Sequence, residues 1–316
     1  MKNSLLQNGE KSYDNITKLL EDIPTPPWRS YQKSNEIITY IPNSNELEII
    51  KAAIYLRRPV LVTGKPGLGK TALAKAIVKA LELDDLLHWQ ITTETTLQDG
   101  LYSYDALGRL QEIQLAEKDD EIDTKIESYL KLQALGTAFA SEDKPKVLLI
   151  DELDKSDVDL PNNLLHIFEE GYFEIPELKR LKGSEEKEIE TLDNKQVKIE
   201  NGKVECTYFP IVIMTSNGER DFPAAFKRRC LQIELHSPDK EELIEIVKSN
   251  LGIDLDSDDN LLELFIKERE SANENIATDQ LLNAIYLRAK GLISEKELDT
   301  LKSNPLLKTI FKPLVD

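Results

Sequence analysis

One short glycine-rich stretch constrains this chain more than any other. The letters G-K-P-G-L-G-K-T occupy residues 64–71, between a β-branched run at 60–63 and a helix-forming run that starts at Ala72. A buried strand, a glycine loop and a helix in this order are the setting of a phosphate-binding loop. The glycines let successive backbone N–H groups point at phosphate oxygens, and the helix N-terminus adds partial positive charge there. The stretch predicts a nucleotide site in an α/β fold.

Two side chains of this loop have distinct expected tasks. Lys70 would reach the β- and γ-phosphates, and the hydroxyl of Thr71 would ligate Mg²⁺. The loop therefore predicts a bound nucleotide with Mg²⁺, and by itself it leaves ATP and GTP open. The residues expected to contact the nucleotide are Gly64, Pro66, Gly67, Leu68, Gly69, Lys70, Thr71 and Ala72.

Charge and cysteine content narrow the class of protein further. The chain has 40 Lys and Arg against 58 Asp and Glu, a net charge of −18, which argues against a protein that mainly coats nucleic acid. Its two cysteines, Cys206 and Cys230, have no metal-binding spacing and fit a reducing compartment. No apolar leader and no run of about 18 apolar residues is present, so we expect a cytoplasmic protein without a membrane span.

The chain divides into three parts by pattern. Residues 1–36 are polar and proline-rich and predict an arm, in which Trp28 is expected to pack on the main body. Residues 37–236 predict a nucleotide-binding core. Residues 237–316 predict a helical domain, with helices expected at 241–250, 260–268, 278–290 and 294–301. Ser237 is the expected first cap and Pro238 the first helical position.

Two segments of the core are longer than simple connections require. Residues 94–140 are punctuated by glycine and acidic in the middle, which predicts an insertion within the connecting helix. Residues 172–208 are rich in Lys and Glu with turn signals, which predicts a solvated hairpin. His88, in a strand predicted at 87–92, has no partner at metal-binding spacing and is expected to be structural.

Carboxylates and an amide follow the two most apolar strands. Four apolar residues at 147–150 precede Asp151 and Glu152, and a strand predicted at 208–215 precedes Asn217. All-apolar strands predict a parallel sheet buried on both faces. Asp151 would hold Mg²⁺, Glu152 would accept a proton from the attacking water, and Asn217 would sit between that water and the γ-phosphate.

A basic pair follows the second of these strands. Arg228 and Arg229 could supply a guanidinium that stabilises charge on the transferred phosphate, or they could be an ordinary surface pair. By spacing alone the two interpretations are equally good.

The order of these motifs resembles that of AAA+ ATPases, and the stretches at 150–155 and 160–176 resemble the MoxR branch. The resemblance covers about residues 37–290. It implies an α/β fold, with a P-loop AAA+ three-layer αβα core built on a parallel sheet and a small C-terminal all-α lid domain. It also implies that Asn217 is the sensor asparagine and Arg229 the arginine finger, with Arg228 as second choice.

One departure from the family pattern concerns the lid. The family often has a second sensor arginine at the start of the third lid helix, but residues 276–282 read I-A-T-D-Q-L-L, with no arginine before Arg288. Arg288 or another residue could substitute, or the lid could sense the nucleotide weakly.

The resemblance implies an ATP-hydrolysing homo-oligomeric ring, expected to be a hexamer, that remodels or activates a protein client, for which a von Willebrand A-type domain protein is one candidate. The client would meet the insertion near 102–110 and the hairpin near Tyr172. Two alternatives stay open: a nucleic-acid translocase, which the charge disfavours, and a nucleotide-gated switch or scaffold of a bacterial defence or signalling system. Intact Glu152 and Arg229 favour turnover over a scaffold.

Overall fold

The computed structural model describes residue 26 and residues 40–84, 86–115, 125–181, 186–272, 276–293 and 304–313. Apart from residue 26, the predicted arm lies outside these ranges, and so do Trp28 and a helix expected at 294–301. Within the described ranges no helix is both long enough and apolar enough to span a membrane.

The centre of the fold is a parallel sheet of five strands in the order β11-β1-β10-β5-β2. The strands are β1 (Val60–Thr63), β2 (Leu87–Gln90), β5 (Val147–Asp151), β10 (Ile211–Ser216) and β11 (Leu231–Glu234). Strand β10 begins three residues later than predicted, because Pro210 has no N–H to donate to a ladder and pairing starts with Ile211 N–H on Lys146 O at 2.9 Å.

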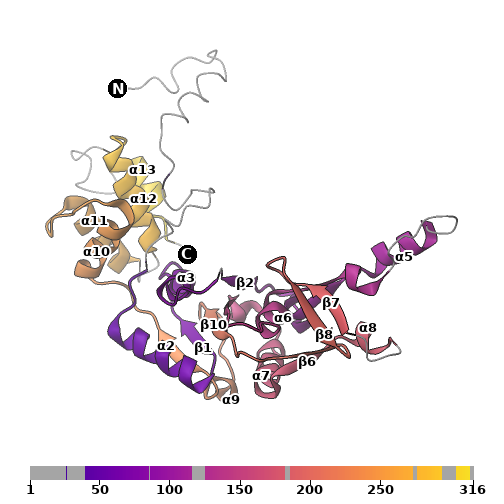
Figure 1. Ribbon diagram of the computed structural model, residues 1–316. Coiled ribbons are helices and arrows are strands. Elements are labelled where there is room, and N and C mark those ends of the chain that lie inside the picture. The colour runs from indigo at the N-terminus through magenta and orange to yellow at the C-terminus, as the bar shows by residue number, and fades with distance from the viewer. Residues whose placement is uncertain are drawn as a thin grey trace, which may run out of the picture.

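Helices cover both faces of this sheet (Figure 1). Val60 and Val62 pack with α2 (Ser44–Leu56) and α3 (Lys70–Ala80). Leu61 points the other way, into the larger cluster that includes α6 (Ala134–Phe139) and α7 (Leu160–Glu170). Since side chains of a strand alternate between faces, strands buried on both sides have to be apolar throughout. The predicted three-layer α/β core is confirmed.

The insertion and the hairpin, predicted as separate features, form one second sheet. Its order is β3-β4-β7-β8-β9-β6. The join is the pair β4–β7, where Lys131 faces Glu190 and its Nζ lies 2.6 Å from Glu190 Oε1. The strands are β3 (Tyr102–Tyr104), β4 (Leu130–Leu132), β6 (Tyr172–Glu174), β7 (Glu186–Glu190), β8 (Gln196–Glu200) and β9 (Lys203–Glu205).

The insertion does interrupt a helical connection, as predicted. Helix α4 (Leu97–Leu101) precedes β3, and α6 follows β4. Between β3 and β4 stand α5 (Ala106–Leu115) and a 3₁₀ turn, η2 (Ile126–Tyr129). Gly136 lets α6 approach α4 closely, because a Cβ there would lie 1.9 Å from Leu101 O.

The predicted solvated hairpin is also present, as β7 and β8. Its charged side chains alternate with Ile189 and Ile199, which are buried against the core. The charged residues therefore form the outer face of a half-buried hairpin.

The C-terminal helices have a hydrophobic core of their own. They are α10 (Lys240–Leu251), α11 (Asn260–Ser271), α12 (Thr278–Ala289) and α13 (Pro305–Ile310), the last of which the sequence did not predict. The expected cap at Ser237 and first turn at Pro238 are wrong. Helix α10 starts two residues later, after Asp239, because Asp239 and Glu242 form a reciprocal capping box with hydrogen bonds of 2.8 and 2.9 Å.

An ion pair ties the second sheet to the main sheet. Lys146, buried at the start of β5, donates to Asp193 Oδ2 in the β7–β8 turn at 2.8 Å. Burial alone would raise the pKa of Asp193, but hydrogen bonds from Lys146 and Thr191 outweigh it and lower the pKa to about 2. The pair should therefore stabilise the fold above about pH 4 and lose this effect as the pH falls towards 2.

Replacing Asp193 by Asn should lower the free energy of unfolding by about 1 kcal/mol at pH 7, after allowance for partial solvent screening. The difference from the parent chain should shrink between about pH 4 and pH 2, because the parent carboxyl is then protonated as well. Urea unfolding at several pH values measures it. Asp143→Asn, at an exposed carboxyl, is the control. A difference that does not change with pH would contradict the ion-pair account.

Candidate nucleotide site

The phosphate loop folds around its own lysine. Gly64, Gly67 and Gly69 have φ of 151°, 80° and 89°, the left-handed region that favours glycine. Lys70 opens α3, and its Nζ donates to the carbonyls of Gly64 at 2.6 Å and Lys65 at 2.8 Å. Burial lowers the pKa of Lys70, while nearby carboxylates, Asp154 first among them, oppose this. The ammonium thus lies within the loop whose N–H groups are expected to face phosphate.

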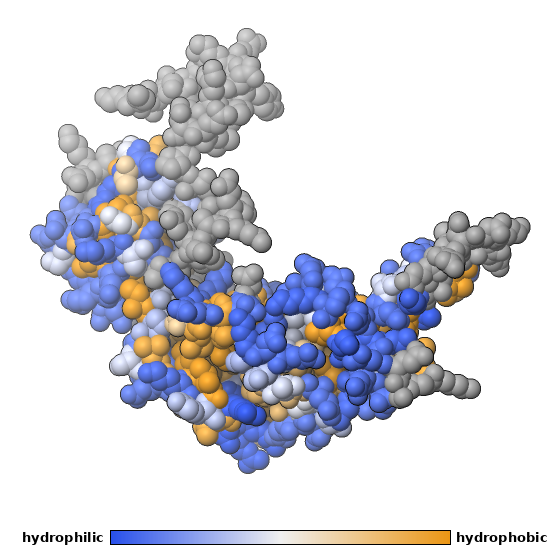
Figure 2. Space-filling view, in the orientation of Figure 1, coloured by the Kyte–Doolittle hydropathy of each residue, from blue (hydrophilic) through white to orange (hydrophobic). Residues whose placement is uncertain are grey.

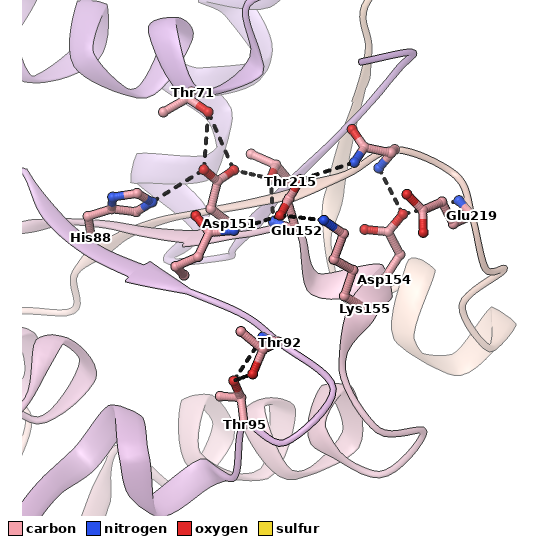
Figure 3. Close-up of polar contacts among 12 residues, drawn as sticks. Thr71, His88, Thr92, Thr95, Asp151, Glu152, Asp154, Lys155, Thr215 and Glu219 are labelled. Carbon is pink, nitrogen blue, oxygen red and sulfur yellow. Dashed lines mark hydrogen bonds and ion pairs between the residues drawn. The ribbon is translucent and has the colours of Figure 1, made fainter. Parts of the chain in front are cut away.

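Thr71 and Asp151 come together from different elements. The Thr71 hydroxyl, at the start of α3, lies 3.2 Å from Asp151 Oδ2 at the end of β5 (Figure 3). A hydroxyl and a carboxylate are hard oxygen donors, which suits Mg²⁺ that keeps waters and phosphate oxygens as its other ligands. The pair therefore fits the predicted magnesium site. Within the described ranges, no cluster of three or more His, Cys, Asp and Glu residues could hold a metal by itself.

Two further residues hold Asp151, and the sequence assigned neither of them a role there. Thr215 on β10 donates to Asp151 Oδ1 at 2.5 Å and accepts from the Glu152 N–H at 2.8 Å. His88 on β2 places Nε2 3.2 Å from Asp151 Oδ2. Burial would raise the pKa of Asp151, but hydrogen bonds from His88, Thr215 and Thr71 outweigh it and lower the pKa. His88 thus contacts the predicted metal ligand, a contact that the sequence did not predict.

Glu152 has an unusual backbone and three side-chain partners. Its φ is 61°, so the residue turns directly after β5 in the left-handed region, which is uncommon for a residue with a side chain. Gln90 donates to Glu152 Oε2 at 2.7 Å, and Lys155 donates to the same oxygen at 2.8 Å. Asn217 Nδ2 lies 3.4 Å from Oε1. The carboxylate is therefore held between the ends of β2, β5 and β10.

The segments after β5 and β10 are bonded to each other. Asp154, in the 3₁₀ turn η3 (Leu153–Lys155), accepts through Oδ2 from the backbone N–H of Asn217 at 2.9 Å and of Glu219 at 3.1 Å. Arg220 donates back to Ser156 O at 2.7 Å. The loop that carries Asn217 is thus fixed to the segment that carries Glu152 (Figure 3).

The two candidate arginines differ in their surroundings. Both follow α9 (Ala224–Lys227) and precede the edge strand β11. Arg229 Nε lies 2.5 Å from Glu169 Oε1 on α7, whereas Arg228 is exposed and makes no ion pair with any described residue. Neither side chain contacts the phosphate loop of its own chain among the described hydrogen bonds and ion pairs.

A cavity of about 450 Å³ opens between the phosphate loop and the C-terminal helices. This volume and position suit the nucleoside part of a nucleotide. Of the eight predicted contact residues, four line the cavity and four do not. Those that line it are Gly67, Leu68, Gly69 and Ala72, and those that do not are Gly64, Pro66, Lys70 and Thr71. Helix α12 contributes Thr278, Asp279 and Leu282.

No lysine or arginine is among the described residues that line this cavity. Arg288, the suggested substitute for a second sensor arginine, is elsewhere. Its Nη2 lies 2.7 Å from Asp259 Oδ2, among the C-terminal helices. Arg288 is therefore held by Asp259 and does not face the phosphate loop.

The parallel sheet, the glycine loop and the carboxylates at the strand ends together define a P-loop nucleotide-binding protein. A family model described as AAA domain (dynein-related subfamily) matches residues 59–230, and the chain belongs to this family of AAA+ ATPases. No curated protein matches the chain.

The solved structures that are similar to this one include two of the same protein, both at low identity. The RuvB Holliday junction branch migration motor of Thermotoga maritima has a TM-score of 0.44 and 14% identity, over 87% of this chain and 72% of its own. A substituted variant of the same protein has a TM-score of 0.41 with the same identity and coverage. Both scores are below 0.5, so the family membership rests on the family model.

Proposed function

We propose that this chain is a MoxR-like AAA+ ATPase that couples Mg²⁺-dependent ATP binding and hydrolysis in an oligomeric ring to the remodelling or activation of a protein client. The observation that carries the proposal is the meeting of four predicted residues at one edge of the sheet. Thr71 contacts Asp151, and Glu152 contacts Asn217, although the four come from distant parts of the sequence. The core at 37–236 would bind the nucleotide, and the helices at 237–316 would close over it as a lid.

The chemistry follows from where these groups stand. Lys70 would exchange its loop carbonyls for the β- and γ-phosphate oxygens, and Thr71 and Asp151 would hold Mg²⁺, which neutralises phosphate charge when bound. Glu152 would accept the proton of the attacking water, and the Asn217 amide would orient that water towards the γ-phosphate. An arginine of a neighbouring subunit, Arg229 in the first instance and Arg228 otherwise, would stabilise the transferred phosphate.

Helix α5, inserted between strands β3 and β4 of the second sheet, is the surface that favours a protein client. Helix α5 projects away from the body of the molecule (Figure 1), and Figure 2 shows apolar surface along it. Leu107, Leu110 and Ile113 are 65%, 52% and 44% exposed, at a spacing that puts them on one side of the helix. An exposed apolar stripe on a projecting element marks a surface that contacts other proteins. In contrast, Tyr172 is half-buried, with Lys203 Nζ 4.2 Å from its ring centroid.

Lys70→Ala tests the nucleotide site. The variant should bind ATP roughly 100-fold more weakly, because a charge-assisted contact with the phosphates is lost. Calorimetric titration of ATP with and without Mg²⁺ measures the effect. Lys75→Ala, at an exposed position on the same helix, is the matched control and should bind normally. Unchanged affinity in the Lys70 variant would overturn the proposed site.

A further inference from the structure

We infer that Asp154 is a positioning residue that sets the place of the Asn217 amide in the active site. The inference rests on the proposed ATPase function and extends it to a carboxylate without a role in the proposed chemistry. Asp154 is 5% exposed and lies three residues after Asp151. One of its oxygens, Oδ2, accepts both backbone N–H groups that follow β10, those of Asn217 and Glu219, at 2.9 and 3.1 Å.

These two bonds decide how the Asn217 segment leaves the sheet. Strand β10 ends at Ser216, so the main sheet no longer holds the backbone of Asn217. Only the Asp154 carboxylate accepts its N–H among the described hydrogen bonds. The Asn217 side chain starts from this fixed point and reaches Glu152 Oε1 at 3.4 Å. A shift of about 1 Å in such a contact can cost about 100-fold in rate.

The other oxygen of Asp154 speaks against a purely structural role. Oδ1 is buried and has no hydrogen-bond partner within the described residues. Burying an unpaired oxygen of a charged group costs stability, so its presence calls for an explanation, and a role in the active site is one such explanation.

Asp154 is not placed to act as a base. Its bonded oxygen faces backbone N–H groups, and the carboxylate near Asn217 Nδ2 is that of Glu152. If Asp154 works only as a hydrogen-bond acceptor, an amide oxygen can replace it. A proton acceptor or a required negative charge could not be replaced in this way.

The test compares Asp154→Ala with Asp154→Asn in steady-state ATP hydrolysis. The alanine variant should lose about 10–100-fold in kcat with KM within about threefold of the parent, and the asparagine variant should keep at least about a third of the parent kcat. Asp193→Ala is the matched control, because it removes a hydrogen-bonded carboxylate at the opposite end of β5. Asp193→Ala should have a lower melting temperature than the parent chain but the same kcat.

Two further measurements test the same inference, and the first of them does not depend on ATP turnover. Hydrogen exchange of the Asn217 and Glu219 amides should be faster in Asp154→Ala than in the parent. If that variant does not fold, Asp154→Ser, whose hydroxyl is too short to reach both N–H groups, takes its place. In an Asn217→Ala background the Asp154 substitution should lower kcat less than about threefold further, since the two residues act as one unit.

Three results would overturn the inference. The first is a parent-like kcat in Asp154→Ala or Asp154→Ser, and the second is an Asp154→Asn variant as slow as Asp154→Ala. The third is an equal loss of ATP affinity in Asp154→Ala and Asp154→Asn, which would mean that the negative charge of Asp154 acts through Lys70. Failure of the proposed function looks different. In that case the parent chain itself hydrolyses no ATP, whereas the amide exchange still reports on the Asp154 bonds.

Discussion

Glu152→Gln should bind ATP and Mg²⁺ like the parent chain but hydrolyse ATP about 10²–10⁴-fold more slowly. An amide cannot accept the proton of the attacking water, whereas the size of the side chain is kept and its one oxygen can still accept the hydrogen bond from Gln90. Calorimetric titration and steady-state hydrolysis measure the two halves of this expectation. The expected signature is an unchanged dissociation constant with a large fall in kcat.

Glu170→Gln is a suitable control, because this glutamate is exposed at the end of α7. It should leave both quantities unchanged. A turnover number close to the parent's in Glu152→Gln would show that another group accepts the proton. The variant has a second use, since a ring held in its ATP state should retain its client in a pull-down, and the parent ring should release that client on hydrolysis.

Arg229→Ala should bind ATP nearly normally and lose hydrolysis by about 10³–10⁵-fold. Arg229 stands between α9 and the edge strand β11 and makes no described hydrogen bond or ion pair with the phosphate loop of its own chain. In the proposed ring it would instead reach a phosphate bound to a neighbouring subunit. Arg229→Lys should recover little, because a lysine cannot present two parallel donors to phosphate oxygens. Binding, turnover and oligomeric state are measured on the same samples.

A mixture of Arg229→Ala and Lys70→Ala chains tests whether Arg229 acts on the nucleotide of a neighbouring subunit. Each variant alone should be inactive, but an intact phosphate site of one subunit can face an intact arginine of another in a mixed assembly. Hydrolysis should therefore reappear at intermediate ratios. No recovery at any ratio, in rings shown by native mass spectrometry to be mixed, would mean that the arginine does not act between subunits.

Arg228→Ala is the matched variant that decides between the neighbouring arginines. Arg229 already pairs with Glu169 within its own chain, whereas Arg228 is exposed, so both deserve the same test. If Arg228→Ala loses hydrolysis and Arg229→Ala does not, the finger is Arg228, and the pair Arg229–Glu169 is a contact within the subunit.

The sequence alone was enough for features whose cause is local. The glycines of the phosphate loop, the apolar strands at 60–63 and 147–150 and the helix signals are written in neighbouring residues, so the α/β class and the nucleotide loop could be predicted. The places of Asp151, Glu152 and Asn217 at the ends of strands could be predicted for the same reason, and their roles stay predictions. Each follows an apolar strand directly, and the carboxyl ends of parallel strands meet at one edge of a sheet.

Only the tertiary structure decided features that depend on contacts between distant segments. Thr215 and Gln90 look like ordinary strand residues, and their roles appear only because β10 and β2 flank β5 and bring them to Asp151 and Glu152. The same holds for the second sheet, whose join between Lys131 and Glu190 links strands 59 residues apart. Short strands and single polar side chains carry no periodic signal, so their partners are set by packing and not by the local sequence.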